Sequence, residues 1–272
     1  MNINTIGFIG AGNMGGAMIG GICNSSLIAP SQILASDYSS AALSRLEDSY
    51  GIRTTSSNED VARESDILFL AIKPNKFTEV LPAITSSLKK DCLVVSIAAG
   101  QSIHAVETLL GSDIKIVRAM PNTPALVGEA MSALCCNELV SKEELSYVKS
   151  LFECFGKAEI VAEDMIDTVI GVSGSSPAYV YMFIEAMADA AVADGMPRQM
   201  AYKFAAQSVL GAAKMVLETG THPATLKDAV CSPGGTTIEA VAALEAGGLK
   251  GTIITAQRAC VQKSKDMTKK NA

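Results

Sequence analysis

Residues Ile6–Gly15 read IGFIGAGNMG, a short apolar run followed at once by the pattern G-x-G-x-x-G. The run predicts a buried strand, and the apolar residues that follow predict a helix. In that context Gly10 permits a tight turn and Gly12 lets a pyrophosphate approach the backbone, while Gly15 lets the helix lie close to the sheet. The segment therefore predicts a dinucleotide site of the Rossmann type.

The start of the predicted helix supplies donors for phosphate oxygens. The N–H groups of Asn13 and Met14 have no partners within a helix, and the positive end of the helix dipole lies beside them. A glycine-rich turn without a ligand is the alternative, but strand, turn and helix all agree with a dinucleotide. The residues predicted to contact it from this loop are Gly10, Ala11, Gly12, Asn13, Met14 and Gly15.

Apolar runs alternate with amphipathic segments over the first 160 or so residues. Residues 67–72 show no polar alternation, which is typical of a parallel strand covered on both faces. The alternation predicts an α/β fold, with a Rossmann-type doubly wound sheet over residues 1–162. The predicted strands are Ile6–Ile9, Ile33–Ser36, Ile67–Ile72, Leu93–Ala98 and Ile116–Ala119.

Two helices in this part have clear signals. Apolar residues recur at helical spacing from Phe77 to Leu88. Ser141 and Glu144 have the spacing of a capping box, which predicts a helix from there to about Phe155.

Further candidate ligand contacts stand at strand ends, where doubly wound sheets bind ligands. Asp37 is placed to bind the adenosine ribose hydroxyls and to disfavour a 2′-phosphate, although a surface or cap aspartate is an equal alternative. Ala71 and Lys73 follow the central strand, where Lys73 is either a ligand contact or a solvated loop lysine. Ala98 and Ala99 are small enough to lie against a flat nicotinamide ring.

Residues 163–272 read as alanine-rich helices with no convincing strand, and form the second predicted domain. The segments Ala178–Asp194 and Ala201–Val216 are apolar around most of their circumference, so they require burial. Because so few residues can hardly bury such faces alone, we expect a second copy of the chain to cover them rather than a compact bundle. The polar tail Lys263–Ala272 is expected to fray.

Composition excludes several classes of protein. With 272 residues, a net charge of -6 and a pI of about 5.1, neither nucleic acid nor a membrane is expected as a partner. No secretory signal or membrane span is expected, and seven scattered cysteines suit a cytoplasmic protein with reduced thiols. The only histidines, His104 and His222, are far apart, so no metal site is expected.

The segment Cys231–Glu239, CSPGGTTIE, places a glycine-rich turn before a helix. Thr236 and Glu239 have capping-box spacing. Such a turn directs several N–H groups at one point, which forms a site for a carboxylate, and the hydroxyls of Ser232 and Thr237 stand beside it. A capped helix start without a ligand is the alternative.

These segments together resemble the Δ1-pyrroline-5-carboxylate reductase family over essentially the whole chain. The first motif is shared with many dehydrogenases, whereas the last three are specific in combination. The matching segments are Gly7–Gly15, Ala71–Pro74, Arg118–Pro124, Gly171–Tyr179 and Lys227–Glu239.

The resemblance implies reduction of 1-pyrroline-5-carboxylate to L-proline by NADPH or NADH, the last step of proline synthesis. It also implies a helical domain that forms a homodimer, often within a decamer of five dimers. Within its motif, Thr237 corresponds to the hydroxyl that contacts the ring nitrogen, and Ser232, Gly234 and Gly235 correspond to the carboxylate cradle. Family members often carry a small or hydroxyl residue at Asp37, so Asp37 is a departure that bears on NADPH use.

The sequence also suggests two other functions, and it argues against the first of them. A β-hydroxyacid dehydrogenase requires a lysine base in the first long helix of its helical domain. Here the helix that starts at Ser175–Tyr179 is followed by no lysine before Lys203. A non-catalytic dinucleotide sensor would keep the glycine loop but would not need the anion turn.

Neither histidine is a compelling acid, so the imine is expected to arrive protonated or to take its proton from water.

Overall fold

The computed structural model describes residues 3–271 and divides into two compact units. One unit comprises Met1–Ser175 with Cys260–Ala272, and the other comprises Ser176–Ala259. The first unit extends beyond residue 162, where the sequence places the domain boundary. The reason is that Ile166 and Ile170 are buried in the same apolar cluster as the sheet.

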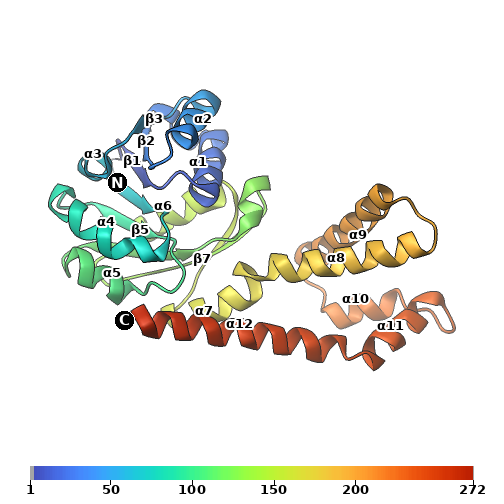
Figure 1. Ribbon diagram of the computed structural model, residues 1–272. Helices are drawn as coiled ribbons and strands as arrows, with labels where there is room; N and C mark the ends of the chain where they lie inside the picture. Colours follow the sequence, from blue (N-terminus) through green and yellow to red (C-terminus); the bar gives the residue numbers. More distant parts are fainter. Residues whose placement is uncertain (1–2, 272) are drawn as a thin grey trace. The chain divides into compact units, whose positions relative to one another are not determined.

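A single sheet forms the centre of the first unit (Figure 1). All its neighbouring strands are parallel except β6 and β7, and its order is β3-β2-β1-β4-β5-β6-β7-β8. Because β1 lies between β2 and β4, the strand order reverses beside β1, which confirms the doubly wound sheet. The strands of the described residues are β1 (Ile6–Ile9), β2 (Ile33–Ser36), β3 (Arg53–Thr55), β4 (Ile67–Leu70), β5 (Leu93–Ser96), β6 (Lys115–Met120), β7 (Ala130–Cys136) and β8 (Gly156–Ile160).

Helices cover both faces of this sheet (Figure 1). One face packs on α1 (Asn13–Ser25), α2 (Ser40–Tyr50) and α6 (Lys142–Glu153). The other packs on α3 (Asn58–Glu64), α4 (Phe77–Ile84) and α5 (Ile103–Leu110). Stacked rings of Phe8 and Phe69, with centroids 4.6 Å apart, lie in the first of these two layers. Burial on both faces explains the uninterrupted apolar strands.

The five predicted strands are all present, with small differences at their ends. β4 and β5 stop at Leu70 and Ser96, two residues before the predicted ends. The sequence did not predict β3, β7 or β8. β3 is half-exposed and β8 is largely exposed, so both lack the continuous apolar run that marks a buried strand.

The helix signals have mixed outcomes. The capping box is confirmed, because the Ser141 hydroxyl accepts from the Glu144 N–H while Glu144 accepts from the Ser141 N–H. The helical spacing from Phe77 continues past α4 as a 3-10 turn, Thr85–Ser87. The expectation of a frayed tail is wrong for the described residues: α12 (Leu249–Asn271) continues through it, and the buried Ser264 hydroxyl donates to Asp167.

The second unit contains only helices among its described residues. α8 and α9 pack side by side (Figure 1). Large apolar side chains on both remain exposed, including Met182 at 69%, Phe204 at 65% and Leu217 at 82%. These are the wide apolar faces for which the sequence predicts a second copy of the chain. The helices are α8 (Ser176–Ala193), α9 (Arg198–Thr219), α10 (Pro223–Ala229), α11 (Thr236–Ala246) and α12 as far as Ala259.

Candidate functional site

The glycine loop has the geometry that each glycine was predicted to provide. Gly10 has φ +106°, and a Cβ there would lie 2.5 Å from the Ala71 carbonyl oxygen. A Cβ at Gly15 would lie 2.2 Å from the Gly10 carbonyl oxygen. Both positions therefore exclude a side chain on steric grounds, and the loop and α1 can approach the sheet closely.

Gly12 differs from these two because it faces open space. A Cβ at Gly12 would meet nothing within 4 Å, and the residue is the N-cap of α1 with no side-chain cap. The N–H groups of the first turn, at Asn13 and Met14, have no intrahelical partner. Open space beside free donors and a positive helix end fits a pyrophosphate.

Asp37 is joined to the glycine loop. Its Oδ2 accepts from the Ala11 N–H at 2.7 Å, and its Oδ1 accepts from the Ser39 N–H at 2.8 Å. The carboxylate is half-buried and follows the last residue of β2. Asp37 thus caps a turn and also follows a strand end at the edge where doubly wound sheets bind ligands, so its position agrees with both alternatives.

The remaining predicted contacts lie along the same edge. β1, β2, β4 and β5 end in register, with Ile9 opposite both Ser36 and Leu70, and Leu70 opposite Ser96. Ala71, Ala98 and Ala99 therefore follow neighbouring strand ends. Lys73 is exposed at the start of a short 3-10 turn, and no ion pair holds it among the described residues. The structure thus gathers the cofactor-binding candidates at one edge of one unit.

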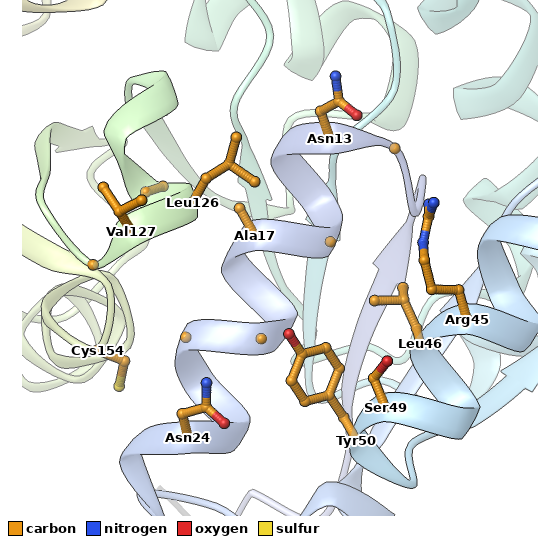
Figure 2. Close-up of a pocket in the computed structure, with 16 residues that line it drawn as sticks. Asn13, Ala17, Asn24, Arg45, Leu46, Ser49, Tyr50, Leu126, Val127 and Cys154 are labelled. Atoms are coloured by element: carbon orange, nitrogen blue, oxygen red, sulfur yellow. The ribbon is translucent and has the colours of Figure 1, made fainter. Parts of the chain in front are cut away.

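A cavity of about 580 Å³ runs along α1 from its first turn (Figure 2). Gly12 and Gly16 place no side chain on this face of the helix, whereas Tyr50 of α2 packs on Gly20. Arg45 extends from α2 towards the start of α1. Arg45 was not singled out from the sequence, because it occurs in an ordinary helical segment. It supplies a positive charge beside the loop predicted to hold phosphates.

The substrate candidates form a tight turn in the second unit. Ser232 accepts from the Gly235 N–H at 3.0 Å through its backbone oxygen, and Gly234 has φ +70°. A Cβ at Gly235 would lie 2.4 Å from the Ser232 hydroxyl oxygen, so a side chain there would displace that hydroxyl from its position in the turn. Ser232 and Gly234 are exposed, whereas Thr237 is half-buried in the first turn of α11.

The predicted capping box at Thr236 is wrong. Gly235 is the N-cap of α11, and Thr236 is already the first helical residue. No side chain caps this helix start, so the hydroxyl of Thr236 does not satisfy the N–H groups of the first turn. The turn consequently leaves backbone donors open, as an anion site requires.

Asn122, in the specific motif Arg118–Pro124, has a buried side chain that the sequence assigned no role. Its Nδ2 donates to the Ser173 carbonyl at 3.1 Å, and its Oδ1 accepts from the Met131 N–H at 3.0 Å. Ser173 belongs to a π-helical turn, Ile170–Gly174, so Asn122 links the end of β6 to that turn. Only its position within a family motif pointed to it.

Neither histidine is placed as an acid. His104 is exposed on α5. His222 is the N-cap of α10, where its Nδ1 accepts from the Ala224 N–H at 3.2 Å, as the sequence predicted for a helix start. Burial raises the pKa of the Cys135 thiol to about 12 and that of Cys23 to about 11, so these thiols remain protonated. The described residues contain no group of three side chains able to hold a metal, and no helix long and apolar enough to cross a membrane.

Family models match both the sheet-containing part and the helical part of the chain. Residues 163–267 match the family model for pyrroline-5-carboxylate reductase dimerisation, and residues 5–100 match that for coenzyme F420-dependent NADP oxidoreductase. The pyrroline-5-carboxylate reductase of Escherichia coli is 56% identical, over 97% of this chain and 98% of its own. That of Methanosarcina acetivorans is 43% identical, over 99% of this chain and 100% of its own.

Solved structures give the same result. The pyrroline carboxylate reductase of Plasmodium falciparum with NADP bound is 36% identical and superposes with a TM-score of 0.89, covering 98% of each chain. That of Coxiella burnetii is 35% identical, with a TM-score of 0.91 over 98% of this chain and 99% of its own. The chain therefore belongs to the pyrroline-5-carboxylate reductase family.

Proposed function

We propose that this protein reduces 1-pyrroline-5-carboxylate to L-proline with NAD(P)H, the final step of proline biosynthesis. The observation that carries the proposal is identity of 56% with the Escherichia coli reductase across 97% of the chain. Such coverage includes the dinucleotide loop and the glycine-rich turn before α11, and the uncapped helix start at each of them supports the proposal.

The dinucleotide fits the edge formed by β1, β2, β4 and β5. When bound, it supplies a hydride for the C5 carbon of the cyclic imine. The proposed contacts to its pyrophosphate come from the loop Gly10–Gly15, because Gly12 leaves open space beside the free N–H groups of α1. Asp37 is proposed to hold the adenosine ribose, with Ala71, Lys73 and the pair Ala98–Ala99 beside the rest of the cofactor.

The substrate carboxylate is proposed to bind the turn at the start of α11. Ser232, Gly234 and Gly235 form this turn, and no side chain caps the N–H groups of the helix start that follows it. Thr237 lies in the first turn of α11 and is proposed to orient the ring nitrogen through its hydroxyl. The Nδ1 atom of His222 accepts a backbone hydrogen bond at the start of α10. We propose that the imine proton comes from solvent or arrives with the substrate.

The protein forms a homo-oligomer through its dimerisation domain. We propose that five dimers assemble into a decamer and that the enzyme acts in the cytoplasm, which agrees with its seven free cysteines.

The functional division is proposed at residues 1–162 and 163–272, because the dimerisation model begins at residue 163. The β-hydroxyacid dehydrogenase reading has no support, since α8 contains no lysine.

Initial rates with 1-pyrroline-5-carboxylate, measured separately with NADPH and NADH, test this proposal. We expect dinucleotide oxidation in stoichiometric amounts with L-proline formation. Reduced-dinucleotide binding, followed by nicotinamide fluorescence, serves as the control that the protein is folded. Binding without turnover would contradict the reductase assignment and would favour a dinucleotide sensor.

A further inference from the structure

Arg118 is an unusually buried cation near the carboxyl edge of the sheet. It lies on β6, and its side chain is 4% exposed. Its Nη1 donates to Glu163 Oε1 at 2.9 Å, but Nε and Nη2 are buried and find no acceptor among residues 3–271. A buried guanidinium held by one hydrogen bond is costly for folding, so its presence calls for a role other than stability.

The position of Arg118 relates it to the nicotinamide end of the proposed site. Arg118 is in register with Ser96, the last residue of β5, whose buried hydroxyl also has no partner among the described residues. The chain continues from Ser96 directly into Ala98 and Ala99. Unsatisfied polar groups therefore gather beneath the segment proposed to contact the nicotinamide.

Glu163 connects Arg118 to that segment. The same oxygen that accepts from Arg118 accepts from the Ile103 N–H at 2.8 Å. Ile103 is the first residue of α5, so this bond holds the end of the loop formed by residues 98–102. The Glu163 side chain is 38% exposed, whereas Arg118 is buried beneath it. Arg118 thus fixes the carboxylate, and the carboxylate fixes the loop.

We propose that Arg118 and Glu163 are a positioning pair that sets the 98–102 loop and, through it, the nicotinamide end of the bound dinucleotide. The proposal rests on the proposed function in one respect, the placement of the nicotinamide against Ala98 and Ala99. Neither residue touches the reacting atoms in this arrangement.

Binding of two ligands that differ only at the nicotinamide end tests the pair. NADH carries the nicotinamide, whereas ADP-ribose lacks it, and calorimetry measures the Kd of both for the full-length protein. For Glu163→Ala we expect the Kd of NADH to rise roughly tenfold and the Kd of ADP-ribose to stay within about twofold. Glu163→Gln keeps an acceptor for Ile103, so we expect an intermediate Kd for NADH.

Two further variants are controls, one for the loss of a nearby carboxylate and one for an unpaired buried charge. Asp164→Ala removes an exposed carboxylate one residue away and should leave both Kd values unchanged. Because Glu163→Ala leaves the Arg118 charge buried without a partner, the double variant Arg118→Met/Glu163→Ala removes that charge as well. We expect this folded double variant to bind NADH as weakly as Glu163→Ala.

Equal weakening of NADH and ADP-ribose would overturn the proposal, because it would indicate a general structural role. An unchanged Kd for NADH in Glu163→Ala and in the double variant Arg118→Met/Glu163→Ala would overturn it as well. These binding measurements do not depend on turnover. A wild-type protein that binds NADH but does not reduce 1-pyrroline-5-carboxylate would therefore contradict the proposed function and leave the positioning pair to be judged by the Kd values.

Discussion

The Asp37 carboxylate joins the end of β2 to the glycine loop, because its Oδ2 accepts from the Ala11 N–H at 2.7 Å. Its other oxygen accepts from Ser39, so the side chain is held in place beside the open space at Gly12. A 2′-phosphate on the adenosine ribose would bring two further negative charges towards this fixed carboxylate. The 2′-hydroxyl of NADH would instead donate a hydrogen bond to it.

Replacement of Asp37 should therefore change cofactor preference. For Asp37→Ser we expect the ratio of kcat/KM for NADPH to that for NADH to rise at least about tenfold. Steady-state rates with each cofactor measure this ratio. Asp48→Ser removes an exposed carboxylate on α2 and is the matched control. The same ratio in both variants would show that Asp37 only caps its turn.

Substitutions at two glycines of the loop should affect different properties: Gly15→Ala the stability of the fold, and Gly12→Ala the affinity for the dinucleotide. Gly15→Ala places a methyl group 2.2 Å from the Gly10 carbonyl oxygen, and we expect a loss of about 1–3 kcal/mol in the free energy of unfolding. Gly12→Ala meets no neighbour, so stability should change by less than about 0.5 kcal/mol. Dinucleotide affinity should nevertheless fall at least about tenfold, because the new methyl occupies the pyrophosphate space. Urea unfolding and nicotinamide fluorescence measure the two effects, and a destabilised Gly12→Ala would contradict this separation.

Local signals explain what could be read from the sequence. The loop Gly10–Gly15 and the cap at Ser141 each lie within a few residues, so a linear pattern records them. β3 has only three residues, and its polar, half-exposed side chains carry no apolar signal. The contact between Arg118 and Glu163 joins residues 45 positions apart, and no pattern within one element records such a pairing.

The role proposed for Thr237 depends on its hydroxyl alone. Thr237→Val keeps the shape of the side chain and should lower kcat/KM for 1-pyrroline-5-carboxylate roughly 10- to 100-fold, since the ring nitrogen loses its partner. The thermal midpoint should not change, because no described contact within the chain uses the hydroxyl. Thr236→Val alters an exposed hydroxyl one residue earlier and is the control. Equal rates for the two variants would exclude the proposed role.

Glu144 should contribute to stability only while it is ionised. Burial acts to raise its pKa, but hydrogen bonds from Lys115 and from Ser141 hold that pKa below its ordinary value of 4.5. A carboxylate with a lowered folded pKa stabilises the protein above its unfolded pKa, and this contribution disappears as the pH falls through the folded pKa.

We therefore expect Glu144→Gln to destabilise the protein by about 1 kcal/mol at pH 7 and to differ less from the wild type at pH 3. Urea unfolding at both pH values measures the difference. Glu143→Gln changes an exposed neighbour in the first turn of α6 and should have little effect at either pH. A difference that persists unchanged at pH 3 would show that the charge of Glu144 is not responsible.

The exposed apolar face of α9 should hold the dimer together. Phe204 is 65% exposed in the single chain, and a large ring left in water is better explained by a covering partner. In a two-fold symmetric interface, one substitution changes the contact twice. For Phe204→Glu we expect the dimer dissociation constant to rise at least about a hundredfold, because each copy would bury an unpaired carboxylate. Sedimentation across a concentration series measures the constant. Gln207→Glu adds the same charge at an exposed polar position on α9, and equal dissociation in both variants would mean that net charge, rather than the apolar contact, controls assembly.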